Sequence, residues 1–224
     1  MKSHLPKIGA ILWKDILYEL RTKDIIVSVA VFVLLVLVIF SFAFDPRAET
    51  VRSLAPGIVW VAFSFAGVLG LNRSFVLEKE KGCLDGLLLC PVPREVIFLG
   101  KMLGSFVFMV LVELLTLPIF SVLFNISLFV PSFLLIALLA TLGFVAVGSI
   151  FSAVAVNTKS REIMLSLLFF PIVVPVIIAA VSASGSILQN APFGELRTWF
   201  QVLAAFDVIF LVVSSLTFEY AVEE

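Results

Sequence analysis

Long apolar stretches alternate with shorter polar segments along the chain. Six of these stretches approach or exceed the roughly 20 residues that a helix needs to cross a bilayer. The strict alternation of apolar and polar positions that is typical of a transmembrane barrel does not occur. The pattern therefore predicts an all-α membrane protein with six transmembrane helices, at about residues 25–44, 54–71, 102–124, 132–156, 163–181 and 199–218.

Basic residues fall mainly on one side of the predicted membrane. Twelve of the 15 Lys and Arg residues lie in segments 1–24, 72–101 and 157–162, and the other three lie in segments on the opposite side. Because cytoplasmic loops of membrane proteins carry the excess of Lys and Arg, we expect both termini in the cytoplasm.

The polar segment before the first span has a helical pattern of its own. Apolar residues recur three or four positions apart between Ile8 and Leu20, which is typical of an amphipathic helix. Trp13 and Tyr18 suit the interface between lipid headgroups and acyl chains. We expect residues 1–24 to form an interfacial cytoplasmic helix. It either anchors the topology or carries the movement of a partner into the first span.

Composition narrows the class of protein further. Apolar residues make up 62% of the 224 residues, charged residues only 14%, and mean hydropathy is +1.21. Soluble domains carry about 25% charged residues, and disordered chains are richer still in charge, so both classes are excluded. A net charge of −1 offers no general attraction to nucleic acid, and we expect none as a partner.

The segment between the second and third spans, residues 72–101, is unusual. A charged patch ends at Gly82, and a short leucine-rich stretch follows that closes at Pro91. Such a stretch is too short to cross lipid, and an apolar patch with a charged rim is typical of a partner site. We expect a short cytoplasmic helix that either docks on a partner or rests on the protein's own membrane face. The candidate docking residues are Glu78, Glu80, Gly82, Leu84, Asp85, Leu87, Leu88 and Pro91.

Two carboxylates lie within predicted spans. Glu113 lies near the middle of the third span, where insertion of a charge costs about 2.5–3.5 kcal/mol, and Asp207 is expected nearer an end of the sixth. Each is either a gating or coupling residue or the partner in a helix–helix hydrogen bond. Small residues in the fourth span, Gly143 and Gly148, permit close helix contact.

The residues for several other chemistries are missing from the sequence. His4 is the single histidine, and Cys83 and Cys90 are the two cysteines, so we expect no metal site and no histidine ligand for haem. The cysteines are seven positions apart, which on a helix exceeds disulfide reach, so we interpret them as small apolar filler. No paired catalytic residues are found. No G-x-x-x-x-G-K-[ST] motif occurs, so any ATP would be hydrolysed by another polypeptide.

Two stretches of sequence carry a family resemblance. Residues 77–101, LEKEKGCLDGLLLCPVPREVIFLGK, resemble the loop of type-2 ABC exporter permeases that precedes the third span. Residues 54–75, LAPGIVWVAFSFAGVLGLNRSF, resemble the cytochrome c maturation protein B family, the haem exporter B subunit. Cys83 and Cys90 stand where this family's pattern leads us to expect Thr or Ser.

The resemblance implies a single permease domain over residues 1–224, with a coupling helix in segment 72–101. It implies a subunit that acts in haem delivery, or release of a haem chaperone, for c-type cytochrome biogenesis. The implied partners are a CcmA-like ATPase, which binds ATP and magnesium and docks on the candidate residues above, and CcmC-like and CcmD-like membrane subunits. It further implies a homodimer within the complex, in the bacterial inner membrane among lipids, with haem handled by the complex and no cofactor or haem ligand in this chain.

Other interpretations remain open at this point. The same architecture could move a lipid, a glycan or a drug, or the chain could be a stand-alone channel or secondary transporter. Exporters of this type often carry a re-entrant helix on the outer side, and we expect one over residues 182–198. Pro171 and Pro175 are expected to break the fifth span just before it.

Overall fold

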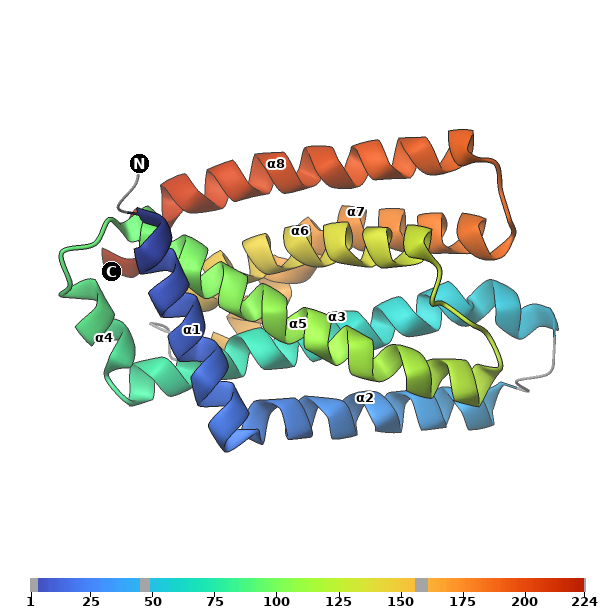
Figure 1. Ribbon diagram of the computed structural model, residues 1–224, viewed down its shortest axis with the longest axis horizontal. Coiled ribbons are helices and arrows are strands. Elements are labelled where there is room, and N and C mark those ends of the chain that lie inside the picture. The colour runs from blue at the N-terminus through green and yellow to red at the C-terminus, as the bar shows by residue number, and fades with distance from the viewer. Residues whose placement is uncertain (1–3, 45–48, 156–160, 224) are drawn as a thin grey trace.

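The computed structural model describes residues 4–44, 49–155 and 161–223. Within these ranges the chain forms eight helices, and six of them are long and apolar enough to cross a membrane, as predicted. The spans are α2, α3, α5, α6, α7 and α8, and Figure 1 shows them side by side as one bundle. The helices are α1 (His4–Thr22), α2 (Asp24–Ala43), α3 (Glu49–Glu80), α4 (Cys83–Leu88), α5 (Arg94–Phe124), α6 (Pro131–Ala155), α7 (Arg161–Leu188) and α8 (Phe193–Glu223).

The helices around the predicted loop 72–101 are longer than the predicted spans. α3 continues to Glu80 and α5 already begins at Arg94, so much of this segment is helical. Glu, Lys and Leu are good helix formers, and they let a spanning helix continue beyond the membrane. By contrast, α6 begins at Pro131, as expected for a proline in the first turn of a helix.

The predictions for the outer part of the fifth and sixth spans were wrong. α7 runs continuously through Pro171 and Pro175 to Leu188, and α8 begins at Phe193 after a short connection. Residues 182–188 therefore belong to α7 and residues 193–198 to α8, and this segment forms no separate re-entrant helix. Proline is tolerated in membrane helices because neighbouring groups can satisfy the freed backbone carbonyls. Asn190, in the left-handed region with a φ of 54°, lets the chain turn between α7 and α8.

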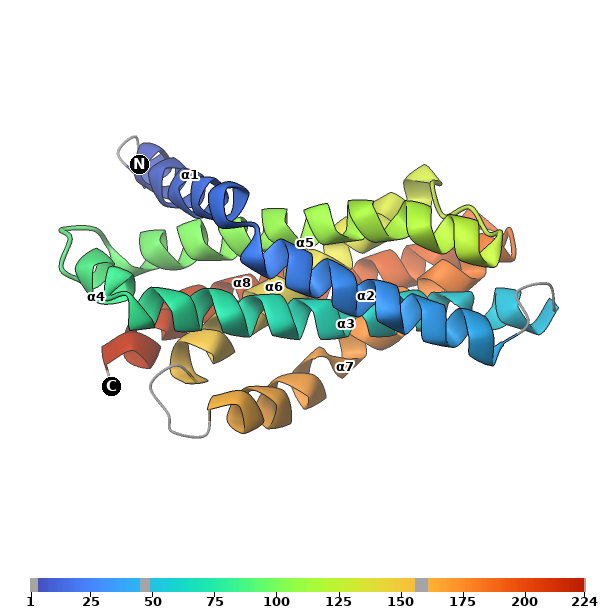
Figure 2. The same ribbon diagram turned by 90° about the horizontal axis from the view of Figure 1, so that it is seen from below.

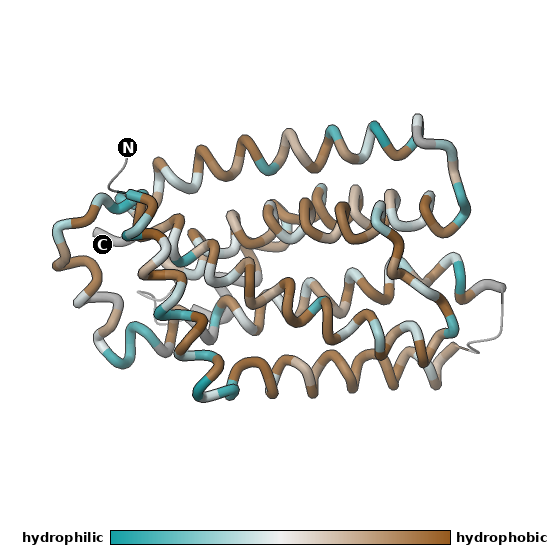
Figure 3. The backbone as a smooth tube through the Cα atoms, viewed as in Figure 1, coloured by the Kyte–Doolittle hydropathy of each residue, from teal (hydrophilic) through white to brown (hydrophobic). Residues whose placement is uncertain are grey.

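One end of the bundle carries both termini together with the two helices that are not spans. Figures 1 and 2 show α1 crossing the bundle there and α4 at its tip. We call this the α4 end. Apolar residues dominate the length of the bundle in Figure 3, while hydrophilic residues gather at its ends, especially around α1. This distribution matches a protein whose bundle lies in lipid and whose α4 end lies in water.

Glycine residues let α6 pack closely at the centre of the bundle. A Cβ atom on Gly143 would lie 2.5 Å from Asp207 Oδ1 of α8, and one on Gly148 would collide with Leu71 of α3. In the most apolar 18-residue stretch of each helix, 67% of the residues of α6 are buried, compared with 22% in α2 and 17% in α8. α6 is therefore a central helix, and the outer faces of α2 and α8 are left for lipid.

Candidate functional site

The α4 end contains a short helix held in place by its flanking residues. Gly82 has a φ of +66°, a left-handed conformation that favours glycine, and it separates α3 from α4. The guanidinium of Arg94 donates a hydrogen bond of 2.6 Å to the Leu88 carbonyl at the end of α4. A short apolar helix is therefore present at the position that the sequence indicates.

The leucines of this segment point in different directions. Leu87 and Leu88 are half-buried and pack against the core of the protein, whereas Leu89 is 86% exposed. The side chains of Leu84 and Asp85 lie outside the described residues. Among the described leucines of this segment, Leu89, just after α4, is the one that points outward, and the candidate docking residues did not include it. The sequence signal for its exposure was its position, because Leu89 follows the last residue of α4 and precedes Cys90 and Pro91.

The predicted polar docking residues also divide into two groups. Glu80, Gly82 and Pro91 are exposed at the α4 end. Glu78 is directed inward, and its side chain is only 15% exposed because it pairs with lysines from α1 and α5. The structure therefore places Glu78 among the contacts that hold the helices together.

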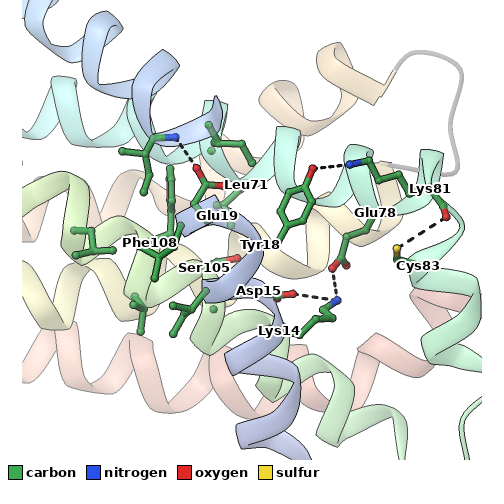
Figure 4. A pocket seen from close by; sticks show the side chains of 18 residues that line it. Lys14, Asp15, Tyr18, Glu19, Leu71, Glu78, Lys81, Cys83, Ser105 and Phe108 are labelled. Carbon is green, nitrogen blue, oxygen red and sulfur yellow. Dashed lines mark hydrogen bonds and ion pairs between the residues drawn. The ribbon is translucent and has the colours of Figure 1, made fainter. Parts of the chain in front are cut away.

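Four charged residues form a network between α1, α3 and α5, and Figure 4 shows Lys14, Asp15 and Glu78 of this network; its fourth member is Lys101. The Lys101 ammonium lies 2.6 Å from Glu78 Oε2 and 3.2 Å from Asp15 Oδ2. The Lys14 ammonium lies 2.5 Å from Glu78 Oε1 and 3.1 Å from Asp15 Oδ1. The Lys101 side chain is only 1% exposed, so it depends on these carboxylates for the interactions that water would otherwise provide.

The network changes the acidity of its members. Burial raises the pKa of Glu78, but the nearby Lys101 and Lys14 ammonium groups outweigh it and hold that pKa below 4.5. Burial lowers the pKa of Lys14, but the Glu78 and Asp15 carboxylates outweigh it and raise that pKa above 10.5. The Lys14–Glu78 ion pair is therefore charged at neutral pH.

Helix α1 is attached to the bundle by more than charge. A Cβ atom on Gly100 would lie 2.8 Å from Ile11, and one on Gly104 would lie 3.0 Å from Asp15 Oδ2, so these two glycines of α5 let α1 approach closely. Lys81, just after α3, donates a 2.7 Å hydrogen bond to the Tyr18 hydroxyl. These contacts favour the interpretation of α1 as a connecting helix, because they join it to elements on both sides of α4.

The two intramembrane carboxylates lie on opposite sides of α6. Glu113 of α5 is 4% exposed and accepts a hydrogen bond from the Thr141 hydroxyl of α6. Asp207 is 3% exposed and lies beside Gly143, two residues further along α6. The expectation that Asp207 lies near a helix end was wrong, because it occupies the middle of α8. Sequence reasoning did not identify Thr141 as the partner of Glu113.

The cysteines do not fill apolar space. Cys83 and Cys90 are both exposed and unpaired at the two ends of the α4 segment, so their interpretation as filler was wrong. Among the described residues no group of three His, Cys, Asp or Glu side chains could hold a metal ion.

Comparisons with known proteins agree with this arrangement. The family model described as "CcmB protein" matches residues 7–224. The chain is similar to the heme exporter protein B of Pseudomonas aeruginosa, with 31% identity over 78% of this chain and 79% of the relative. It is similar to that of Bradyrhizobium diazoefficiens, with 27% identity over 92% of each chain. It also matches that of Rhodobacter capsulatus, with 32% identity over 66% of this chain and 68% of the relative. Because the family model covers nearly the whole chain, the chain belongs to the CcmB family.

Proposed function

We propose that the chain is the permease subunit of an ABC transporter complex that serves haem delivery for c-type cytochrome biogenesis. The observation that carries this proposal is the family match over residues 7–224, whose curated relatives are named heme exporter protein B. In the proposed orientation the α4 end lies in the cytoplasm of a bacterium and the bundle lies in its inner membrane. The excess of Lys and Arg in segments 1–24 and 72–101 supports that orientation.

The chain contributes the membrane part of the complex and leaves ATP hydrolysis to a partner. Its sequence has no phosphate-binding loop of the G-x-x-x-x-G-K-[ST] type, so ATP and magnesium would bind a CcmA-like subunit. α4 is the proposed docking element, with the exposed Leu89 entering an apolar groove of that ATPase. CcmC-like and CcmD-like subunits and a second copy of this chain complete the proposed complex.

The contacts of α4 suggest how movement of the ATPase reaches the membrane. α4 is joined to α3 through Gly82 and to α5 through residues 89–93. Glu78 near the end of α3 and Lys101 of α5 form an ion pair, and both also contact α1 through Lys14 and Asp15. A push on α4 therefore moves α1, α3 and α5 together, because breaking this buried network would leave charges without partners.

The proposed function predicts a specific defect in cells that lack the gene. Covalent haem on c-type cytochromes should disappear from haem-stained gels of such cells and return when the wild-type gene is restored. The apocytochrome should still be made, which an immunoblot would check. If covalent haem is unaffected, the complex serves another cargo, such as a lipid, a glycan or a drug, and the assignment to cytochrome biogenesis is wrong.

A second prediction concerns Glu113, whose burial in the membrane suggests a role in turnover. Glu113→Gln keeps the size of the side chain and an oxygen that can accept the Thr141 hydrogen bond, but it removes the carboxyl group. We expect normal protein levels with at least about tenfold less covalent haem on cytochromes, which corresponds to about 1.4 kcal/mol. Thr141→Ser, which keeps the hydroxyl donor, is the matched control and should retain activity. Full activity of Glu113→Gln would show that the Glu113 carboxyl group is not needed for turnover and that the residue contributes only to helix packing.

A further inference from the structure

A cavity of about 200 Å³ lies under the second half of α1. α1, α2, α3 and α5 all contribute to its wall, and Figure 4 shows their side chains around it. Most of the wall is apolar, with Ile25 of α2, Leu71 of α3, and Phe108 and Leu111 of α5 among its lining residues. Water is poorly held in such a space, because a buried water molecule needs two to four polar partners.

Both cations that line this cavity lie on one side of it, while the Glu19 carboxylate and the Ser105 hydroxyl also contribute to its wall. Lys14, Tyr18, Glu78 and Lys81 lie at the α4 end, where α1 crosses the bundle and α3 ends. Lys81 is exposed, and its ammonium lies 2.7 Å from the Tyr18 hydroxyl. The cavity thus presents a cation and a hydroxyl at one end and a mainly apolar wall beyond them.

The apolar side of the cavity is continuous with the lipid-facing surface of two spans. Leu111 of α5 is 39% exposed and lines the cavity, and Val27, the residue after Ile26 of the cavity wall, is 55% exposed. Glu19, which also lines the cavity, accepts a 2.8 Å hydrogen bond from the backbone N–H of Ile26. This bond fixes the corner between α1 and α2, so the space between them is held open by the fold.

We propose that this cavity is a binding site for one acyl chain of a membrane phospholipid, whose phosphate lies beside Lys81 and Tyr18. A phospholipid has its charged headgroup at the membrane surface and its hydrocarbon deeper in the bilayer. The cavity has the matching arrangement, with its cation and hydroxyl at the α4 end and its apolar wall deeper in the bundle. The bound chain fills the space between α1 and the spans and so holds α1 in its position against α5. The volume is below the about 300–1,000 Å³ of pockets for drug-sized ligands, so the cavity has room for part of a linear chain and not for a larger, compact ligand.

Photocrosslinking of the full chain in lipid nanodiscs tests this proposal. The discs contain phosphatidylethanolamine and phosphatidylglycerol, with a minor fraction of phosphatidylglycerol that carries a diazirine on one acyl chain. We expect adducts, mapped by peptide mass spectrometry, to concentrate on the cavity-lining parts of α1, α2 and α5. Equal labelling along the whole lipid-exposed length of α5 would show only bulk lipid and would overturn the proposal.

Two variants on α5 make the test specific. Val107→Trp fills the cavity and should reduce its adducts about tenfold, whereas Val122→Trp, at a position that is 82% exposed and outside the cavity, should leave them unchanged. Lys81→Glu should lower retention of the anionic lipid in native mass spectrometry, with added inorganic phosphate unable to compete. Unchanged adducts in Val107→Trp would overturn the proposal.

The wild-type labelling pattern serves as a readout if the tryptophan variant fails to fold. Added haem is a further probe: if it displaces the adducts and gives a stoichiometric Soret band, the cavity is a haem site and the lipid assignment is wrong. This inference does not rest on the proposed function. If deletion cells lose covalent haem but the cavity is not labelled, only the lipid site is overturned. If the cavity is labelled but covalent haem is unaffected, only the cytochrome assignment is overturned.

Discussion

Replacing Lys101 with alanine is expected to lower the stability of the protein by about 3–5 kcal/mol, the cost of breaking a buried ion pair by removing one partner. The Lys101 side chain is 1% exposed and lies within 3.2 Å of both Glu78 and Asp15. Its removal leaves two largely buried carboxylates with only Lys14 as a cation. Thermal unfolding in detergent would measure the loss, and hydrogen exchange should show faster exchange in α1.

Lys14→Ala is the matched control for this experiment. Lys14 contacts the same two carboxylates, but its side chain is 44% exposed, so solvent screens its pairs and we expect a loss of at most about 1 kcal/mol. Double replacement of Lys101 by Met and Glu78 by Gln should recover part of the stability, since no unpaired charge would remain on that pair. Equal stability of the Lys101 and Lys14 variants would contradict the central role of Lys101.

The same network predicts how acid acts on α1. Because Lys101 and Lys14 hold the pKa of Glu78 below 4.5, ionised Glu78 stabilises the folded state above its ordinary pKa, and this contribution is lost as the pH falls through the lowered value. Asp15 acts in the opposite direction, because burial raises its pKa above 3.8 even though Lys101 opposes the rise. Protonation of Asp15 therefore favours the folded state and offsets part of the loss from Glu78. Unfolding of the wild type and Glu78→Gln from pH 7 to pH 3 should converge as acid removes the contribution of Glu78.

Leu89→Asp is expected to abolish association with the ATPase while leaving the permease folded. Leu89 is 86% exposed, so a carboxylate at this position costs the isolated chain little. In the proposed complex the side chain enters an apolar groove, where truncation of a central contact costs 2 kcal/mol or more and an unpaired charge costs still more. Copurification of the ATPase with the tagged permease should fall at least about 30-fold, and covalent haem on cytochromes should fall with it.

Leu5→Asp is the matched control for docking, because Leu5 is a leucine of α1 that is 75% exposed. Leu87 and Leu88 make poorer tests, since both pack against the core and a charge there would also disturb the fold. If Leu89→Asp copurifies with the ATPase as well as the wild type does, α4 does not dock through this side chain. In that event the exposed Glu80 and the side of the segment around Gly86 would be the next surfaces to vary.

The sequence by itself determined the six spans, the short helix after Gly82 and the family of the chain. These features depend on local properties: the length of apolar stretches, the conformational freedom of glycine, and sequence patterns contained within residues 54–75 and 77–101. The helix start at Pro131 was likewise predictable from its immediate neighbours.

Only the tertiary structure decided which charged and polar side chains contact one another. Lys101 meets Asp15 across 86 residues, Lys14 meets Glu78 across 64, and Thr141 meets Glu113 across 28. In the folded chain the Glu78 side chain points inward, Leu89 is exposed to solvent, and Asp207 lies beside Gly143 in the middle of the bundle. Local periodicity can show which face of a helix is apolar. In a chain with this many apolar residues nearly every helix face is apolar, so periodicity does not show which faces meet. Which faces meet is fixed only when the helices pack, through the close approach that Gly100, Gly104 and Gly143 allow and the need of each buried charge for a partner.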